Sequence, residues 1–154
     1  RFYSVAEHSI HCTAFAQSQH IHCLLHDAHE AFISDIPTPI SKFLGGLGEV
    51  KRSIQDQIYQ YLGLEFGVDP FTGKKNPHLA PRIEFIDKSV LSAEKHALMP
   101  DAPDWPELEG IEPANVEIIC FDSESAEQAF AVLANMLTPD HNGDRGASVT
   151  HRTS

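Results

Sequence analysis

Apolar residues recur at helical spacing in the first third of the chain. Val5, Cys12 and Phe15 form one stripe that also contains His8. A second face is apolar at these positions: Ile21, Leu24, Leu25, Ala28 and Phe32. Because positions three, four and seven residues apart lie on one side of an α-helix, the pattern predicts one helix from residue 5 to about 19 and another from about 21 to 32.

The same periodicity predicts three further helices. One runs from about 48 to 64, with this apolar face: Val50, Ile54, Ile58, Tyr61 and Leu62. Another starts at Pro81, a residue that suits a helix N-terminus, and ends near Met99. The last follows Asp122, which caps it, and ends near Leu137. Between them, 116–121 reads as a strand or an extended link, and 65–80 as a long loop, either a lid or a plain connection.

These elements indicate an all-α fold. A chain of 154 residues can enclose one core, so we expect a single compact helical bundle of about five main helices with one long loop. The domain is expected to cover 1–138. The polar residues 139–154 are expected to form a disordered tail.

Charge and composition limit the classes of molecule that the protein is expected to bind. Eleven Lys and Arg stand against 22 Asp and Glu, a net charge of −11, which disfavours binding to a nucleic-acid polymer or an acidic membrane surface. Binding of a small phosphorylated compound is compatible with this negative charge, because a bound metal can reverse the charge of one pocket. Three scattered cysteines and the lack of a long apolar run predict a protein of the cytoplasm.

Ten histidines are the unusual feature of the composition, and most lie near the predicted second helix. On that helix His26, Asp27 and Glu30 would share the face opposite the leucines. An imidazole with two neighbouring carboxylates is suited to a metal site with an acid/base group beside it. A solvated polar face is the alternative. A separate structural zinc site of His and Cys lacks the usual paired-cysteine spacing.

Two polar residues on apolar stripes favour the metal site. His8 interrupts the first stripe, although a single buried histidine is more often a core residue than a ligand. Asp87 flanks the stripe of the helix that starts at Pro81. A carboxylate desolvated there is costly unless it is paired or bound to a metal.

Four segments in order, YSVAEHS (3–9), LLHDAHEA (24–31), DIPTP (35–39) and DKSVLSAE (87–94), resemble the signature of the HD-domain metal-dependent phosphohydrolases. They are most similar to the branch of bacterial 5′-deoxynucleotidases and phage deoxynucleotide phosphohydrolases. The resemblance covers about residues 1–99. It implies an all-helical HD domain, which agrees with the predicted helices.

The resemblance also implies roles for individual residues. The metal ligands would be His8, His26, Asp27 and Asp87. Glu30 and Asp35 would be catalytic, orienting or deprotonating the attacking water and assisting the leaving group. The mixed His and Asp set suits one divalent ion, with Mn, Co, Fe, Ni, Zn and Mg all open.

The substrate contacts are less regular than the ligands. Arg1, Thr38 and Lys42 occupy or adjoin positions that would contact phosphate. A lysine common in the branch is replaced by Ser41, and a basic position one turn before Asp87 holds Glu84. Both departures weaken the case for a polyphosphate substrate.

Two functions follow from these residues. The first is hydrolysis of a phosphate ester, most plausibly a deoxynucleotide, by water activated at the metal. The second is a binding or regulatory module in which the metal is structural. Association into a homo-oligomer through exposed helix faces is a further expectation.

Overall fold

The computed structural model describes residues 2–34, 36–68 and 73–138, and for Thr38 and Pro39 the backbone only. Within those ranges all regular secondary structure is helical, apart from an isolated bridge between Val68 and Lys75, so the all-α prediction is confirmed. The helices are α1 (Val5–Phe15), α2 (His20–Leu24), α3 (Glu30–Ile33), α4 (Thr38–Ser41), α5 (Leu47–Tyr61), α6 (Leu79–Leu98) and α7 (Ser123–Leu137), with the short 3₁₀ helix η1 (Pro106–Leu108). The residues predicted to form a disordered tail, 139–154, lie outside the described residues.

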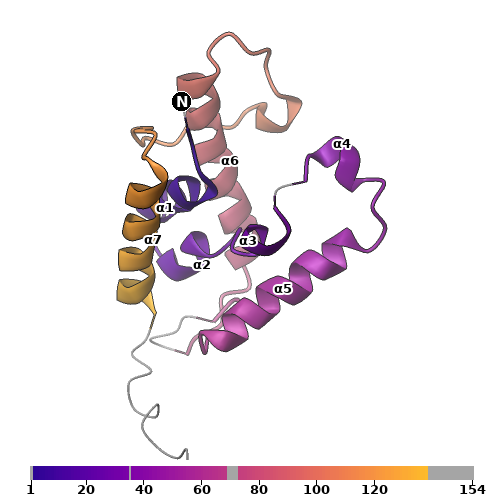
Figure 1. Ribbon diagram of the computed structural model, residues 1–154, viewed down its shortest axis with the longest axis vertical. Helices are drawn as coiled ribbons and strands as arrows, with labels where there is room; N and C mark the ends of the chain where they lie inside the picture. The colour runs from indigo at the N-terminus through magenta and orange to yellow at the C-terminus, as the bar shows by residue number, and fades with distance from the viewer. Residues whose placement is uncertain (1, 35, 69–72, 139–154) are drawn as a thin grey trace, which may run out of the picture.

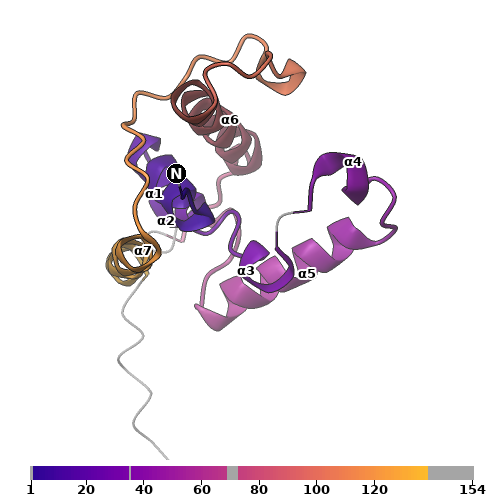
Figure 2. The ribbon, with the colours of Figure 1, turned by 45° about the horizontal axis from the view of Figure 1, so that its top comes forward.

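Helix α1 is the centre of the fold. It packs against α2, α6 and α7, and these four helices form the body seen in Figures 1 and 2. One apolar cluster joins α1 to α6 through Cys12, Ile86 and Val90, and a second joins α2 to α5 and α7 around Leu24 and Tyr59. The strongest burial therefore lies around the segment that carries the candidate chemistry.

Leu24 offers a direct test of this packing, because its side chain has no solvent exposure. We expect Leu24→Ala to lower the free energy of unfolding by about 2–5 kcal/mol, since it removes buried methyl groups and leaves a cavity. Urea unfolding followed by circular dichroism measures this change. Val132→Ala on α7, where the side chain is 57% exposed, should stay within about 0.5 kcal/mol of the original protein.

Helices α4 and α5 extend away from α1 and α6 in both ribbon views. The C-terminal end of α5 contacts the other helices through Tyr59, which is 3% exposed. Tyr61, predicted to lie on the apolar face, is 85% exposed, so that prediction is wrong. The helix ends at Tyr61 and not near residue 64, because Leu62 leaves the helical conformation and Gly63 takes a positive φ of 65°.

The first predicted helix is also shorter than expected. It ends at Phe15, with Ala16 already extended, and Gln19 lies in the left-handed region at φ 61°. Val5, assigned to the core stripe, is 43% exposed.

The second predicted helix, 21–32, is two short helices joined by turns at residues 25–29. Two side chains take the carbonyl groups that a continuous helix would use. The Gln55 amide donates to the Leu25 carbonyl at 2.5 Å, and His26 Nδ1 lies 2.8 Å from the Cys23 carbonyl. His26 and Asp27 therefore stand in a turn, where the backbone presents them differently from the helical face that periodicity predicted.

The segment 116–121 forms no strand, so of the two predicted alternatives the link holds, although Cys120, at a positive φ of 65°, is not extended. The fully buried carboxylate of Glu7 accepts the backbone N–H groups of Cys120 and Phe121, each at 2.8 Å. Asp122 caps α7 by accepting from the backbone N–H of Ser125, as predicted. Helix α6 begins at Leu79, two residues before the predicted start, with Pro81 inside its first turn.

None of the helices among the described residues is both long enough and apolar enough to span a membrane.

Candidate metal centre

Three parts of the chain meet at one point. Helix α1 supplies His8, the turn after α2 supplies His26 and Asp27, and α6 supplies Asp87. His8 Nε2 lies 3.1 Å from Asp87 Oδ1, and His26 Nε2 lies 3.9 Å from the same oxygen. Asp27 Oδ2 is 3.1 Å from His26 Nε2. The structure thus brings together the four side chains that the sequence resemblance names as metal ligands.

His26 has one ring nitrogen engaged and one available. Nδ1 bonds the Cys23 carbonyl, which fixes the ring with its Nδ1–H pointing at the backbone. Nε2 is buried, and although Asp27 lies nearby, Nε2 makes no hydrogen bond to any described residue. A buried polar atom without a hydrogen bond is uncommon in folded proteins, and a metal ion would satisfy it. This atom is the best structural sign that the site fits a cation.

The two histidines differ from the two aspartates in exposure. The imidazoles are about nine-tenths buried, at 11% and 9% side-chain exposure, whereas Asp87 and Asp27 are 37% and 28% exposed. The carboxylate side of the cluster is therefore the side that solvent and a small ligand can reach.

Electrostatics favour positive charge at this point. Burial opposes protonation of both rings, but contacts with the Asp87 and Asp27 carboxylates outweigh it and raise the pKa of His26 to about 10. The pKa of His8 is raised as well: burial works against this, and contacts with Asp87, Cys12 and Glu94 prevail. Burial would raise the pKa of Asp87, yet the two imidazoles hold it well below its usual range. Protons and a metal ion would compete for the same atoms.

Cys12 offers a different donor to the same histidines. Its Sγ lies 3.5 Å from His8 Nε2, and the Cys12, His8 and His26 donor atoms all lie within 4.8 Å of one another. Cys12 is 1% exposed and belongs to the apolar cluster between α1 and α6. A cation bound through sulfur would sit toward the core, and one bound through Asp27 and Asp87 would sit toward solvent.

Glu30 begins α3 beside the cluster. Its carboxylate forms a second group of potential donors with Asp27 and His29, again within 4.8 Å of one another. Glu30 Oε1 also lies 3.9 Å from the ammonium of Lys51 on α5. Sequence reasoning missed Lys51, because it lies on a different helix and its helical pattern marks it only as a polar surface position.

The other predicted site residues are either outside the described residues or away from the cluster. Arg1 and Asp35 lie outside the described residues, as does the side chain of Thr38. Lys42 is exposed in the turn after α4, which both ribbon views place apart from α1 and α6, so the structure does not bring it to the cluster.

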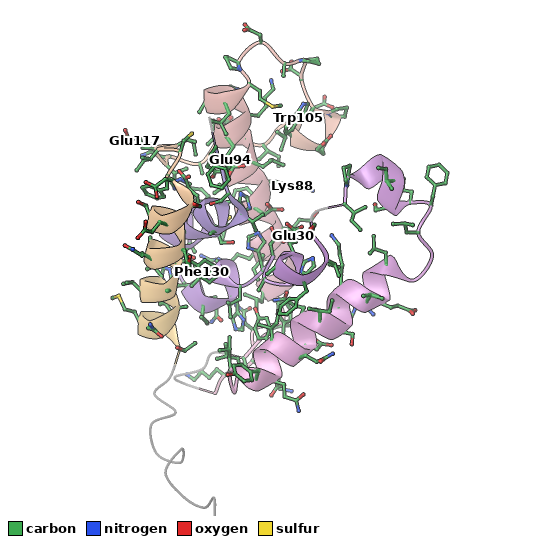
Figure 3. The ribbon with its side chains drawn as sticks, in the orientation of Figure 1. Glu30, Lys88, Glu94, Trp105, Glu117 and Phe130 are labelled. Carbon is green, nitrogen blue, oxygen red and sulfur yellow. The ribbon has the colours of Figure 1, made fainter. Side chains whose placement is uncertain are left out.

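Sequence reasoning also missed two residues on the far side of His8. Glu94 is buried on α6, and its Oε1 lies 2.6 Å from His8 Nδ1 and 2.6 Å from the hydroxyl of Tyr3. Glu94, labelled on α6 in Figure 3, follows Asp87 by seven residues, which places both on one helix face. This spacing was the sequence signal that could have indicated Glu94, because a carboxylate on a buried face needs a partner.

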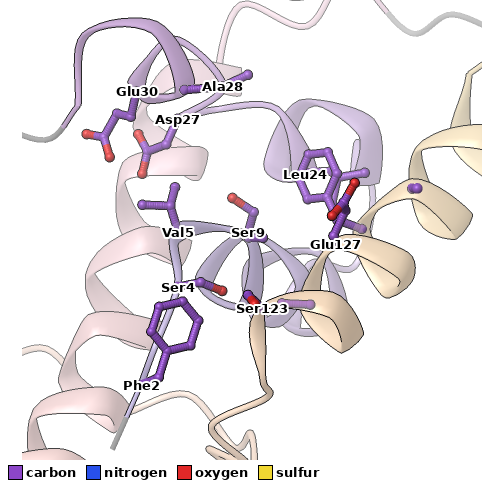
Figure 4. A pocket seen from close by; sticks show the side chains of 15 residues that line it. Phe2, Ser4, Val5, Ser9, Leu24, Asp27, Ala28, Glu30, Ser123 and Glu127 are labelled. Atoms are coloured by element: carbon purple, nitrogen blue, oxygen red, sulfur yellow. The ribbon is translucent and has the colours of Figure 1, made fainter.

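Two cavities border the cluster. One of about 440 Å³ lies between α1, α3 and α7, and Figure 4 shows Asp27 and Glu30 at one end of it, with Val5, Ser9 and Leu24 along its walls. The other, of about 260 Å³, is bordered by His26 and Asp87 together with Glu84. A small ligand could reach the cluster from either side.

The fold and the site define an all-α protein with histidine, cysteine and carboxylate groups positioned to hold a metal ion. The chain is similar to the uncharacterized protein YfdR of Escherichia coli (strain K12), with 30% identity over 112 residues. The match covers 71% of this chain and 57% of the relative, so the chain spans little more than half of that protein's length. No family model and no solved structure matches the chain.

Proposed function

We propose that this protein is a metal-dependent phosphohydrolase of the HD type that acts on a small phosphorylated compound. The observation that supports this most strongly is the juxtaposition of two imidazoles and two carboxylates from three parts of the chain, with the buried His26 Nε2 lacking a hydrogen bond. His8, His26, Asp27 and Asp87 would hold one divalent ion. These four side chains would hold the ion on the protein side and would leave its solvent side open to water and substrate.

The residues around the cluster suit hydrolysis of a phosphate ester. A divalent ion bound here would lower the pKa of water and withdraw charge from the phosphate oxygens. Glu30 would accept the proton of the attacking water, since its carboxylate lies in the same donor group as Asp27. Lys51, close to Glu30, would attract the substrate phosphate. Asp35, outside the described residues, is proposed to assist the leaving group.

The cavities favour one phosphate group over a chain of them. The larger cavity has a mostly apolar wall, and its ionisable residues are all acidic: Asp27, Glu30 and Glu127. In the smaller cavity, Glu84 stands near Asp87 and pairs with Lys88 at 2.7 Å. Because carboxylates repel additional phosphates, we propose a monophosphate substrate with an organic part, most plausibly a deoxynucleotide.

The three cysteines are unpaired, which is compatible with the proposed cytoplasmic location.

The test is phosphate release by metal-depleted protein reloaded with Mn²⁺ or Co²⁺. A panel of nucleoside monophosphates, nucleoside triphosphates and simple sugar phosphates is offered under the same conditions. We expect release from monophosphates, loss of activity with a chelator, and recovery on adding metal back. Release from triphosphates alone would contradict the assignment of substrate.

A binding or regulatory module with a structural ion is the second candidate. Glu84 favours it, because the phosphohydrolases that the sequence resembles commonly have a basic residue at this position, and an acidic one at the cavity beside Asp87 would not hold a phosphate. Protein that binds the metal but releases no phosphate from any compound in the panel would support this module and contradict the hydrolase.

A further inference from the structure

One imidazole of the candidate centre is held between two carboxylates of a single helix. His8, on α1, has Asp87 Oδ1 at 3.1 Å from Nε2 and Glu94 Oε1 at 2.6 Å from Nδ1. Asp87 and Glu94 are seven residues apart on α6, about two turns, so they share one face. Each ring nitrogen of His8 therefore has its own carboxylate.

The hydrogen bonds on the Glu94 side fix the direction of the ring. Glu94 Oε1 also receives the hydroxyl of Tyr3 at 2.6 Å. An ionised carboxylate can only accept, so the Tyr3 O–H and the His8 Nδ1–H both donate to it. With Nδ1–H donating to Glu94, Nε2 is the ring nitrogen that faces Asp87 and His26 Nε2, and a metal ion bound there would take the place of its proton.

We propose that Glu94 and Tyr3 are a positioning pair that sets the tautomer and orientation of His8 as a metal ligand. Carboxylates that accept the second N–H of a ligand histidine fix its ring and increase its basicity, and removing such a partner commonly weakens metal binding 10- to 100-fold. This inference rests on the proposed metal centre. Neither residue is assigned a contact with the substrate.

A purely structural role for Glu94 makes a different prediction. Glu94 is buried, and its hydrogen bonds tie His8 of α1 and Tyr3, which precedes that helix, to α6. If it only joined these elements, its removal would lower the stability of the metal-free protein and leave the affinity of the folded protein for metal unchanged. Metal affinity is therefore the measurement that separates the two roles.

The experiment is a titration of metal-depleted protein with Co²⁺, followed by its visible absorption, for the original chain and three variants. We expect Glu94→Ala to bind Co²⁺ about 10- to 100-fold more weakly. Glu94→Gln should lose less, since its amide oxygen can still accept from His8, and Tyr3→Phe should lose least. The band positions should also shift in the Glu94 variants, because the ring is held less firmly.

Glu7→Gln is the matched control. Glu7, at 0% exposure, is buried even more deeply than Glu94 and lies next to His8 in sequence, but its carboxylate accepts from the backbone of Cys120 and Phe121. This variant should lose stability and keep the Co²⁺ affinity and spectrum of the original chain. If Glu94→Ala fails to fold, Glu94→Gln and Tyr3→Phe carry the test.

The outcomes separate this inference from the proposed function. Folded Glu94 variants with unchanged Co²⁺ affinity and spectrum would overturn the positioning role and leave the hydrolase proposal intact. An original chain that binds Co²⁺ without releasing phosphate would overturn the hydrolase and leave the positioning role intact. An original chain that binds no Co²⁺ would overturn both.

Discussion

Replacing His26 with alanine is expected to abolish binding of a divalent ion and reduce phosphate release to background. The side chain supplies the buried Nε2 that makes no hydrogen bond to the described residues and lies within 3.9 Å of Asp87 Oδ1. Without it, the other candidate ligands lose the ring that stands between Asp27 and Asp87. Calorimetric titration with Mn²⁺ and a phosphate-release assay measure the two effects.

The same variant should lose the stabilisation that metal gives to the fold. A ligand that binds only the folded state at 100 times its dissociation constant adds about 2.7 kcal/mol. For a chain of this size that is a rise of about 5–10 °C in melting temperature. We expect this rise in the original chain and its absence in His26→Ala.

Two further variants show whether the effect belongs to this site. His96→Ala, an exposed histidine on α6, should keep both the metal and the melting shift. Cys12→Ser should also keep them if the ion is bound through Asp27 and Asp87. Loss of the ion in Cys12→Ser, with a sulfur-to-metal charge-transfer band in the Co²⁺ form of the original chain, would contradict the carboxylate ligand set and favour the Cys12, His8 and His26 group.

Helix periodicity could predict the fold class because a helix that packs on a core carries its apolar residues on one face. Helix α6 shows this best. Its sequence predicts an apolar stripe of five residues, and all but the last are buried: Ile83, Ile86, Val90, Ala93 and Ala97. The cap of α7 could be predicted because Asp122 acts on backbone groups three residues away. Both signals are local, so the amino-acid sequence contains them directly.

The break between α2 and α3 could not be predicted in the same way. The periodicity of the apolar residues continues through 21–32, and no proline or glycine interrupts it. What ends the helix is the side chain of Gln55, 30 residues away, which donates to the Leu25 carbonyl. Contacts of this kind depend on the completed fold.

The residues of the candidate site divide in the same way, into those that local sequence predicts and those that only the completed fold brings together. The sequence predicts one helix face for His26, Asp27 and Glu30. Asp27 lies 3.1 Å from His26 and shares a donor group with Glu30, but His26 and Asp27 stand in a turn and Glu30 begins α3. Glu94, Tyr3 and Lys51 contact the site from distant positions, 86 residues from His8 in the case of Glu94. Only the packing of α1, α5 and α6 around the site reveals them. Their roles, like those of the predicted ligands, stay predictions.

Glu30→Gln is expected to separate catalysis from metal binding. The substitution keeps the size of the side chain and removes its capacity to accept a proton from water. Since general base catalysis contributes about 10²- to 10⁴-fold, kcat should fall by that factor, while the affinity for Mn²⁺ and the melting shift with metal stay as in the original chain. Glu49→Gln, an exposed carboxylate on α5, should change neither.

The number of bound ions decides what a different result would mean. Glu30 shares a potential donor group with Asp27 and His29, so the cluster could in principle hold a second ion through Glu30. If the original chain bound two ions and Glu30→Gln bound one, Glu30 would be a ligand and the proposed proton transfer would be wrong. If both bound one ion and both kept the full rate, the base would have to lie elsewhere. A single ion retained together with a large loss of kcat is the result that assigns the proton to Glu30.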